Sequence, residues 1–523
     1  MKERYTILFC ILLCMPLIPS PLEAAIKDPV RTKSGLVSGV QGNDPSITVF
    51  KFIPYAAPPT GNLRWRPPQP PSPWQGDRKS FSFGPSCIQN LVDERKPWTR
   101  EFMTQGEISE DCLSLNVWTP AKSPSERHPV FVYIHGGAFS EGSGGVPVYD
   151  GEGLAKKGLV VVTANYRLGV LGFLAHPELS NESSHGASGN YGLLDQIAVL
   201  RWVKENISGF GGDPKRVTIA GQSAGGIAVH SLIASPLAKG LFHRAIIQSG
   251  GSGVDPGGFT FQPRDRKTAE ADGVKFAESL KVYSIAQLRE KSPQELIAQA
   301  DGESMFRFAP IIDGYVLPVS PQDAVAFGEY NDVPVLTGIN AGELGGLIPD
   351  ESPVTVDSFV EHARKEYGAM ADEFLKLYPA EGDDDVRSAR PQSRRDRSLA
   401  SLYLWAKGRA STSKTPSFIY FWDHALPGPD AERFGAFHSS EIPYVMNTLY
   451  MSDRPFVDAD RSIADMMSTY WRNFAVTGDP NGEELPSWAP VGDSPEVMGL
   501  GDKTGAIPLA PGKFSFFTKF LRR

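Results

Sequence analysis

Residues 216–233 read Arg-Val-Thr-Ile-Ala-Gly-Gln-Ser-Ala-Gly-Gly-Ile-Ala-Val-His-Ser-Leu-Ile. This stretch joins a β-branched, apolar run typical of a buried strand to an apolar run typical of a helix. Between the two runs lies Gly-x-Ser-x-Gly, centred on Ser223. Small residues on both sides of a serine let the chain turn sharply, so that the hydroxyl projects above the sheet and the following helix points its N-terminus at it. The pattern predicts Ser223 as a nucleophile.

The rest of the chain repeats the alternation of strand-like and helix-like runs. A helix is predicted over 193–207. Further buried strands are predicted over 129–134, 159–164, 244–248, 333–337 and 417–421. Such alternation indicates the α/β class, with a mostly parallel central sheet flanked by helices. In such sheets the reacting groups lie on loops beyond the carboxyl ends of the strands.

Two stretches without strand-like runs predict insertions that cap the sheet and shape a pocket. The first covers 251–305, with candidate helices at 269–280 and 293–300, and the second covers 354–376. A charge-dense run at 383–397 follows. We expect this run to be a solvated loop and the start of a helix, with an anion-binding role as the less favoured alternative.

The composition is that of a globular protein. The chain has 523 residues, of which 41% are hydrophobic and 21% charged, and its formal net charge is −8. An acidic balance argues against nucleic acid or an anionic membrane surface as the partner. Although the length would allow several domains, large α/β enzymes often form one, and we expect a single domain over 25–523.

The N-terminus predicts a signal peptide over 1–24. A short charged start precedes an apolar run at 5–18 and a small-residue zone near Ala24 and Ala25, which is the order of regions in a secretory signal. The alternative is a single N-terminal anchor helix. No later run is long and apolar enough to cross a bilayer, so the mature chain is expected to be secreted or periplasmic, without membrane insertion.

The cysteines fit an exported protein. Cys10 and Cys14 lie in the predicted signal and leave with it, whereas Cys87 and Cys112 remain. An even pair in an exported chain predicts one disulfide. The alternative is two free buried thiols in a cytosolic enzyme.

A serine nucleophile needs a base to accept its proton. In the chain order Ser, acid, His that this strand–turn–helix motif implies, the base follows a late strand. His438 lies in a glycine-bearing loop after the strand at 417–421. His424 is nearer to that strand but continues it, so we interpret it as structural. His438 is therefore the predicted base.

The acid that orients the base is expected after an earlier strand. Glu343 follows the strand at 333–337 in Gly-Ile-Asn-Ala-Gly-Glu. Asp313, in Ile-Ile-Asp-Gly-Tyr, is the nearest rival, but Asp-Gly is typical of a turn. Glu343 is the predicted acid.

An oxyanion is stabilised by preorganised donors, usually backbone amides. The stretch His135-Gly-Gly-Ala-Phe139 follows a predicted strand and offers amides that bulky side chains do not shield. Gly137 and Ala138, together with Ala224 beside the nucleophile, therefore form the predicted oxyanion hole. The alternative is a glycine-rich turn without a chemical role.

These residues resemble the type-B carboxylesterase and cholinesterase-like family over nearly the whole mature chain. Besides the motifs already given, the resemblance rests on Glu110-Asp-Cys-Leu-Ser-Leu-Asn-Val-Trp-Thr-Pro120, Asn165-Tyr-Arg-Leu-Gly-Val-Leu-Gly-Phe173, Gly189-Asn-Tyr-Gly-Leu-Leu-Asp-Gln196, Gln248-Ser-Gly250, Gly435-Ala-Phe-His438 and Trp471-Arg-Asn-Phe with Gly-Asp-Pro480. The family implies an α/β-hydrolase fold, a Ser–Glu–His triad at Ser223, Glu343 and His438, an oxyanion hole at Gly137, Ala138 and Ala224, and a Cys87–Cys112 disulfide at the pocket mouth.

The chain departs from the family pattern in several places. Leu344 follows the acid where a glycine is usual, Ser114 replaces Tyr or Thr, and Ala138 replaces a third glycine. Gln222 stands where cholinesterases have a glutamate. Counting back from Cys112, Trp98 lies several residues away from the position where their cation-binding tryptophan would fall. A choline ester is therefore not expected, because the anionic and aromatic trap for a cation is missing.

The sequence thus predicts a serine carboxylesterase that hydrolyses a small-molecule ester through an acyl-enzyme. We expect no cofactor or metal, and the oligomeric state stays open. The alternatives are an adhesion module, which would lack the serine or histidine, a lipase acting at lipid interfaces, and an amidase. A polyanionic ester is a further hypothesis, resting on Arg387, Arg390, Arg394, Arg395 and Arg397.

Overall fold

The computed structural model describes residues 26, 28–251, 254–255, 260–302, 306–343 and 355–522. The predicted signal peptide at 1–24 lies outside the described residues, as does Leu344. In the part of the chain that the structure describes, none of the helices combines the length and the apolar character needed to span a bilayer.

Among the described residues, eleven strands form one sheet whose middle is parallel. In spatial order, the parallel strands are β10 (Val160–Ala164), β9 (His128–Ile134), β11 (Gly212–Gln222), β12 (Arg244–Gln248), β15 (Val335–Asn340), β16 (Ser417–Trp422) and β17 (Glu496–Leu500). The six strands that the sequence predicts all belong to this region, so the prediction of a mostly parallel sheet is confirmed.

Antiparallel strands complete the sheet at both edges. β18 (Gly505–Pro508) pairs with β17 at one edge. The other edge consists of β8 (Ser114–Thr119), β4 (Thr48–Pro54) and β3 (Val40–Gln41). The disulfide between Cys87 and Cys112 forms with an S–S distance of 2.04 Å, which confirms the predicted bond. It closes a loop just before β8.

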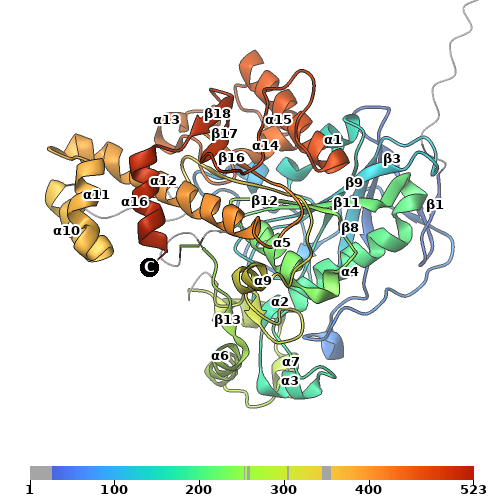
Figure 1. Ribbon diagram of the computed structural model, residues 1–523. Helices are drawn as coiled ribbons and strands as arrows, with labels where there is room; N and C mark the ends of the chain where they lie inside the picture. The colour runs from blue at the N-terminus through green and yellow to red at the C-terminus, as the bar shows by residue number, and fades with distance from the viewer. Residues whose placement is uncertain are drawn as a thin grey trace, which may run out of the picture.

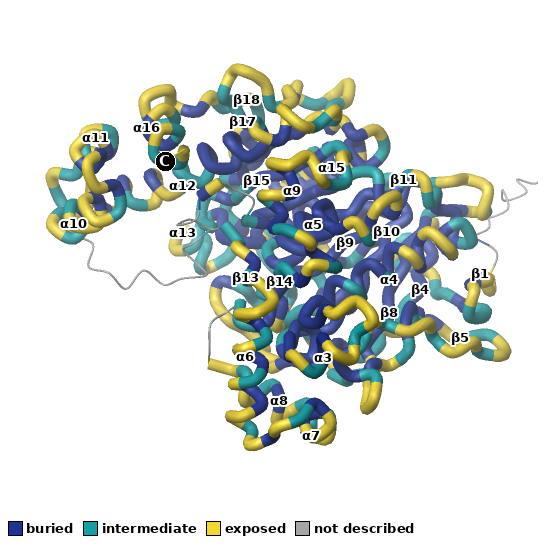
Figure 2. The backbone as a smooth tube through the Cα atoms, turned by 60° about the horizontal axis from the view of Figure 1, so that its bottom comes forward, coloured by how far each residue is buried: buried dark blue, intermediate teal, exposed yellow. Residues whose placement is uncertain are grey.

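Helices cover both faces of the sheet (Figure 1). On one face lie α4 (Tyr191–Asn206) and α5 (Ala224–Ala234), and on the other lies α15 (Asp458–Thr477). Because successive side chains of a strand point to opposite faces, β9 contributes to two cores. Val130 and Val132 belong to the core that includes α4 and α5, whereas Phe131 and Tyr133 belong to the core that includes α15. Figure 2 shows this buried centre in dark blue.

The predicted insertions are helical. α6 (Arg266–Ser279), α7 (Ile285–Glu290) and α8 (Pro293–Ala300) form one group, and α10 (Val356–Tyr367) and α11 (Ala371–Leu377) belong to another. In Figure 1 the second group lies beside α12 (Asp383–Arg409) and α16 (Pro511–Leu521), away from the sheet. It has its own aromatic core, which includes Tyr367, Phe374 and Phe516.

The charge-dense run at 383–397 is helical throughout, as part of α12. The expectation of a loop followed by a helix start was therefore wrong for most of the run. Val386 and Ala389 are buried in the core shared with α16. A chain segment more than a hundred residues further on thus supplies the apolar partner that makes this charged stretch a helix.

Candidate active site

Ser223 lies at a sharp turn between β11 and α5. Its backbone has φ 58° and ψ −124°, a strained conformation for a residue with a side chain. The Ser223 amide donates to the carbonyl oxygen of Gln248 at 2.9 Å, and the Ser223 carbonyl accepts from Ile227 at 2.9 Å. The turn is thus fixed by β12 on one side and by the first turn of α5 on the other.

The glycines of the motif allow close approach of the backbone. A Cβ atom on Gly225 would lie 2.1 Å from the carbonyl oxygen of Ile134, and one on Gly221 would lie 2.5 Å from the carbonyl carbon of Gly225. Neither position has room for a side chain. The sequence pattern therefore reflects a steric requirement of this turn.

His438 and Glu343 are in direct contact. The Nδ1 atom of His438 and the Oε2 atom of Glu343 form a very short hydrogen bond. The other carboxylate oxygen, Oε1, accepts from the hydroxyl of Ser249 and from the backbone amide of Asn340, the latter at 2.8 Å. With the acid held from three sides, the imidazole ring has one defined orientation.

The second ring nitrogen of His438 points to the turn that carries Ser223. Its Nε2 atom lies 3.1 Å from the Nε2 atom of Gln222, which precedes Ser223 and is buried. The structure thus brings the predicted acid, the predicted base and the predicted nucleophile's turn together, although they come from segments up to 215 residues apart.

A buried carboxyl group lies behind the histidine. Glu441 accepts from Gln248 Nε2 at 3.0 Å and from Asn340 Nδ2 at 2.6 Å. Burial raises the pKa of Glu441 to about 7, and the charge of nearby Glu343 acts in the same direction. Because Asn340 also donates to the carbonyl of Phe437 at 2.8 Å, it joins the loop of the acid to the loop of the histidine.

The predicted oxyanion loop follows β9 and has left-handed backbone at three successive residues: Gly137 at φ 102°, Ala138 at φ 53° and Phe139 at φ 60°. A Cβ atom on Gly137 would lie 2.1 Å from the carbonyl oxygen of Glu141. Among the described residues, none accepts a hydrogen bond from the amides of Gly137 and Ala138, so both are available to an incoming oxygen.

A neutral histidine supports the base of this loop. The ring of His135 stacks on Tyr166 with centroids 4.4 Å apart, and the Tyr166 hydroxyl donates to the His135 carbonyl at 2.9 Å. Burial lowers the pKa of His135 to about 4. His135 is therefore uncharged at neutral pH, and it holds the loop by packing and by a 2.8 Å contact between its Nδ1 atom and the carbonyl oxygen of Gly136.

The rival residues lie in other environments. One carboxylate oxygen of Asp313 accepts from the backbone amides of Tyr315, Val316 and Leu317 at 2.8–3.0 Å, as a residue that organises a turn does. His424 lies between Asp460 and Asp502, at 2.9 and 2.5 Å. Each is occupied by contacts that hold a loop.

The arginines of α12 are also engaged with acidic groups. Arg397 pairs with Asp255 and with Glu366, and these hydrogen bonds raise its pKa although burial opposes the change. Arg395 pairs with Asp396 at 3.0 Å. Arg395 and Arg397 are therefore engaged within the protein, which weakens the polyanionic-ester hypothesis at two of the five arginines on which it rests. Among the described residues, no group of acidic, histidine or cysteine side chains could hold a metal ion.

The sequence that builds this site matches a known protein family. The sequence model of the Carboxylesterase family matches residues 27–509. The chain belongs to the carboxylesterase family. This carboxylesterase has the α/β-hydrolase fold and is a carboxylic ester hydrolase of type B.

Several relatives of this carboxylesterase are esterases. It is 40% identical to the fumonisin B1 esterase of Sphingopyxis macrogoltabida, over 94% of this chain and 91% of that relative. It is 35% identical to the cocaine esterase of Homo sapiens, over 90% and 87%. A solved structure of PNB esterase is similar with a TM-score of 0.76 and 30% identity, covering 93% of this chain and 98% of that one.

Sequence reasoning missed the residues of this carboxylesterase that support the histidine and the acid. Ser249 and Asn340 lie within stretches that the sequence singled out, and Glu441 lies three residues after His438, but none of the three received a role. For Asn340 and Glu441 the available signal was a polar side chain three residues from a predicted catalytic residue, and for Ser249 there was none beyond its place at the end of a predicted strand. Whether these side chains point into the site depends on how loops from separate strands are arranged, and only the folded structure shows that arrangement.

Proposed function

We propose that this carboxylesterase hydrolyses esters through a Ser223–Glu343–His438 triad and an acyl-enzyme intermediate. Nε2 of His438 accepts the proton of the Ser223 hydroxyl, and Oγ attacks the ester carbonyl carbon. The amides of Gly137, Ala138 and Ala224 stabilise the oxyanion. Protonated His438 then gives its proton to the leaving alkoxide, and a water molecule repeats the sequence to release the acid.

The hydrogen bond between His438 and Glu343 carries this proposal. It leaves the Nδ1 proton on the side of the acid and directs Nε2 to the Gln222–Ser223 turn. A base oriented in this way by a third group, beside a serine on a strained turn, is the arrangement that activates a hydroxyl nucleophile. Gln222 fits both protonation states, because its side-chain amide can present N–H to the neutral ring or its oxygen to the charged ring.

We infer that the ester carries an apolar group. Phe139 of the oxyanion loop has its ring centroid 6.3 Å from that of Phe261, and Phe261 lies 5.5 Å from Phe306. Phe261 and Phe306 are only half-buried. The Phe139 ring itself is fully buried, so Phe261 and Phe306 are the aromatic rings that we expect an acyl or alcohol group held at the oxyanion loop to meet.

We also infer that the protein is exported from the cytosol. Residues 1–24 have the pattern of a signal peptide, and the Cys87–Cys112 disulfide requires an oxidising compartment to persist. We infer that the mature protein is a single domain that is secreted or periplasmic.

Hydrolysis of an ester panel tests the proposal. The panel holds p-nitrophenyl esters of increasing acyl length, one ester with an anionic acyl group, and fumonisin B1, and it is run with the wild type and with Ser223→Ala. We expect burst kinetics with the wild type on neutral esters and a loss of turnover of about a million-fold in the variant. Full activity of Ser223→Ala would exclude the triad. A jump in rate above the solubility limit of the substrate would favour a lipase.

A further inference from the structure

The loop closed by the Cys87–Cys112 disulfide contacts the backbone of the candidate base. We propose that Trp98, within this loop, is a positioning residue that fixes His438 by hydrogen-bonding its carbonyl oxygen. This inference rests on the proposed role of His438. Trp98 would act on the reaction only through the histidine.

The contact is made by the indole N–H of Trp98. It donates to the carbonyl oxygen of His438 at 3.1 Å and lies 3.3 Å from the hydroxyl oxygen of Ser439. Ser439 has φ 84°, in the left-handed region that a residue with a side chain rarely adopts. Such a conformation persists only where surrounding contacts hold it. The indole bond to the adjoining peptide is one of these contacts.

Aromatic packing holds the indole in place. Trp98 meets Phe437, the residue before His438, edge to face with centroids 6.4 Å apart. Phe102, from the same disulfide loop, meets Phe437 at 5.9 Å. The residues on both sides of His438 are therefore in contact with the loop.

Charged contacts fasten the loop to the segment that precedes the histidine. Lys96 pairs with Asp430. Arg454 donates to Glu101 at 2.7 Å and to Thr99 at 2.5 Å, and it also donates to the carbonyl of Pro427 at 3.0 Å. Trp98 thus lies in a loop that is anchored on both sides of it in sequence.

The opposite side of the loop is tied to the oxyanion segment. The side-chain amide of Gln89 donates to the carbonyl of Gly142 and accepts from its amide, at 2.9 and 2.8 Å. Arg95 pairs with Glu141. The carbonyl oxygen of Glu141 packs against Gly137 of the oxyanion loop, 2.1 Å from where a Cβ atom would lie. One disulfide-closed loop therefore spans from the oxyanion segment to the histidine, and Trp98 is its contact with the histidine.

The expected consequence is a specific loss of turnover. Misplacing a reacting group by a fraction of an ångström lowers the rate of the chemical step. A single neutral hydrogen bond contributes modestly to positioning. Without the indole N–H, the peptide between His438 and Ser439 loses a fixed partner, and the ring samples orientations from which Nε2 cannot reach the Ser223 hydroxyl.

The test compares Trp98→Phe with Trp74→Phe. Trp74 is a matched control, because its indole N–H also donates to a backbone carbonyl, that of Leu36 at 2.8 Å, outside the site. Kinetics on p-nitrophenyl acetate are measured below both melting temperatures. For Trp98→Phe we expect kcat to fall about five- to tenfold with KM within about twofold, and for Trp74→Phe we expect both constants to stay at wild-type values.

A spectroscopic readout separates positioning from general loosening. The proton between His438 Nδ1 and Glu343 should give a far-downfield ¹H resonance, which should shift upfield or broaden in Trp98→Phe and stay unchanged in Trp74→Phe. An unchanged kcat in Trp98→Phe would overturn the inference, as would a reduced kcat with an unaltered resonance. If His438→Ala kept full activity, the proposed function would fail instead, whatever Trp98→Phe does.

Discussion

The amino and carboxyl ends of strands β15 and β16 both carry buried polar side chains, but the two ends are built differently. At the carboxyl ends lie Asn340 and, three residues on, Glu343, and Trp422 of β16 donates to Ser440 of the histidine loop at 2.9 Å. At the amino ends lies Arg409, the last residue of α12, with its polar partners.

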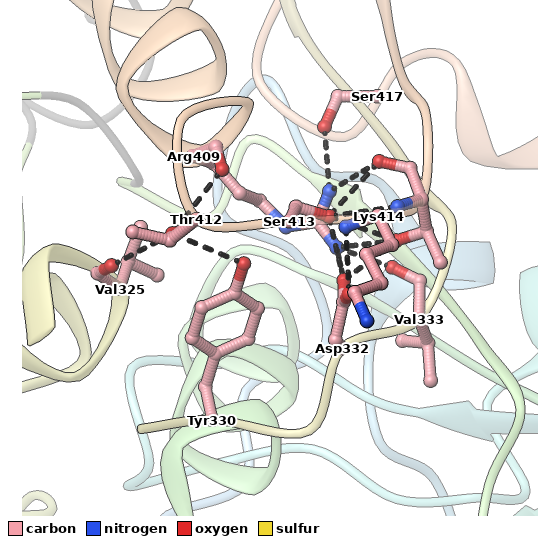
Figure 3. A network of polar contacts seen from close by, with 10 residues as sticks. Val325, Tyr330, Asp332, Val333, Arg409, Thr412, Ser413, Lys414 and Ser417 are labelled. Carbon is pink, nitrogen blue, oxygen red and sulfur yellow. Dashed lines mark hydrogen bonds and ion pairs between the residues drawn. The ribbon is translucent and has the colours of Figure 1, made fainter. Parts of the chain in front are cut away.

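The amino ends form an anchor (Figure 3). The guanidinium group of Arg409 is buried and donates to Asp332 at 3.0 Å, to the carbonyl of Val333 at 2.5 Å and to the Ser417 hydroxyl at 3.0 Å. Asp332 in turn accepts from the backbone amide of Lys414 at 2.8 Å. These contacts join the end of α12 to the starts of both strands.

At the carboxyl ends of the strands, by contrast, the backbone is strained. Of the ten residues other than glycine with positive φ among those described, five lie at the site: Ala138, Phe139, Ser223, Ser249 and Ser439. None of the five residues named in the Arg409 anchor belongs to this set. Strained backbone collects at functional sites because surrounding contacts can hold groups there in an orientation that relaxed backbone would not give.

The difference indicates that one pair of strands supports the stability of the fold at its amino ends and the candidate active site at its carboxyl ends. Substitutions at the amino ends should lower stability and leave turnover intact, whereas substitutions at the carboxyl ends should lower turnover with little effect on stability. The first two predictions below examine this separation, beginning with the larger effect. The third concerns Glu441, the one group at the carboxyl ends for which we expect an effect on stability, because its ionisation is opposed by burial.

Glu343→Gln should lower kcat by about 10³- to 10⁴-fold, because a neutral amide can no longer fix the histidine tautomer or stabilise its charged form. The melting temperature should change little. Asp313→Asn is the control: Asp313 accepts three backbone amides in its turn, so this variant should lose stability and keep kcat. The opposite pattern, with Asp313→Asn inactive and Glu343→Gln active, would transfer the role of the acid to Asp313.

Arg409→Ala should destabilise the fold by roughly 2–4 kcal/mol, because it removes several hydrogen bonds at once together with the packing of a buried side chain. Guanidinium unfolding followed by tryptophan fluorescence measures the change. Turnover per folded molecule should stay within about twofold of wild type. Arg387→Ala is the matched control, since Arg387 is exposed and its ion pair with Asp384 lies at the surface, and it should have almost no effect. A large loss of turnover in Arg409→Ala would contradict the separation of the two ends.

Glu441→Gln should change the pH dependence of stability. Burial raises the pKa of Glu441 from 4.5 to about 7, so the folded state keeps a proton that the unfolded state releases. Stability from this group is fully present below pH ~4.5 and declines as the pH rises to about 7, by up to about 3 kcal/mol in total. Glutamine is neutral throughout, so the variant should lack this decline.

The control for this prediction is Glu484→Gln, since Glu484 is exposed, and it should keep the wild-type profile. Denaturation midpoints between pH 4.5 and pH 8 measure both variants. Parallel profiles for wild type and Glu441→Gln would show that Glu441 is charged in the fold throughout this range.

The buried parallel strands could be predicted from sequence because both of their faces are covered. A strand such as β10, predicted at 159–164 and observed at Val160–Ala164, reads Val-Val-Val-Thr-Ala and is buried throughout, as expected for a central parallel strand. The antiparallel edge was not predicted. In β8, Ser114 and Asn116 alternate with Leu115 and Val117, and nothing in this local pattern specifies which strands it pairs with.

The site could be predicted as separate residues but not as a set of contacts. Ser223, His438 and Glu343 stand out because each follows a predicted strand in the order that the chemistry requires. Trp98 could be excluded from one role by its spacing. Its contact with His438 depends on how a disulfide-closed loop folds over another loop more than three hundred residues away, and local sequence does not encode that.

The most direct test of the account is the location of the acyl group. The protein is mixed with a slowly deacylating p-nitrophenyl ester, quenched in acid during the burst and digested for mass spectrometry. We predict one acyl group per chain, on the Ser223 hydroxyl, and none in Ser223→Ala. An acyl group on another residue, or turnover without any covalent intermediate, would contradict the assignment of Ser223 as the nucleophile.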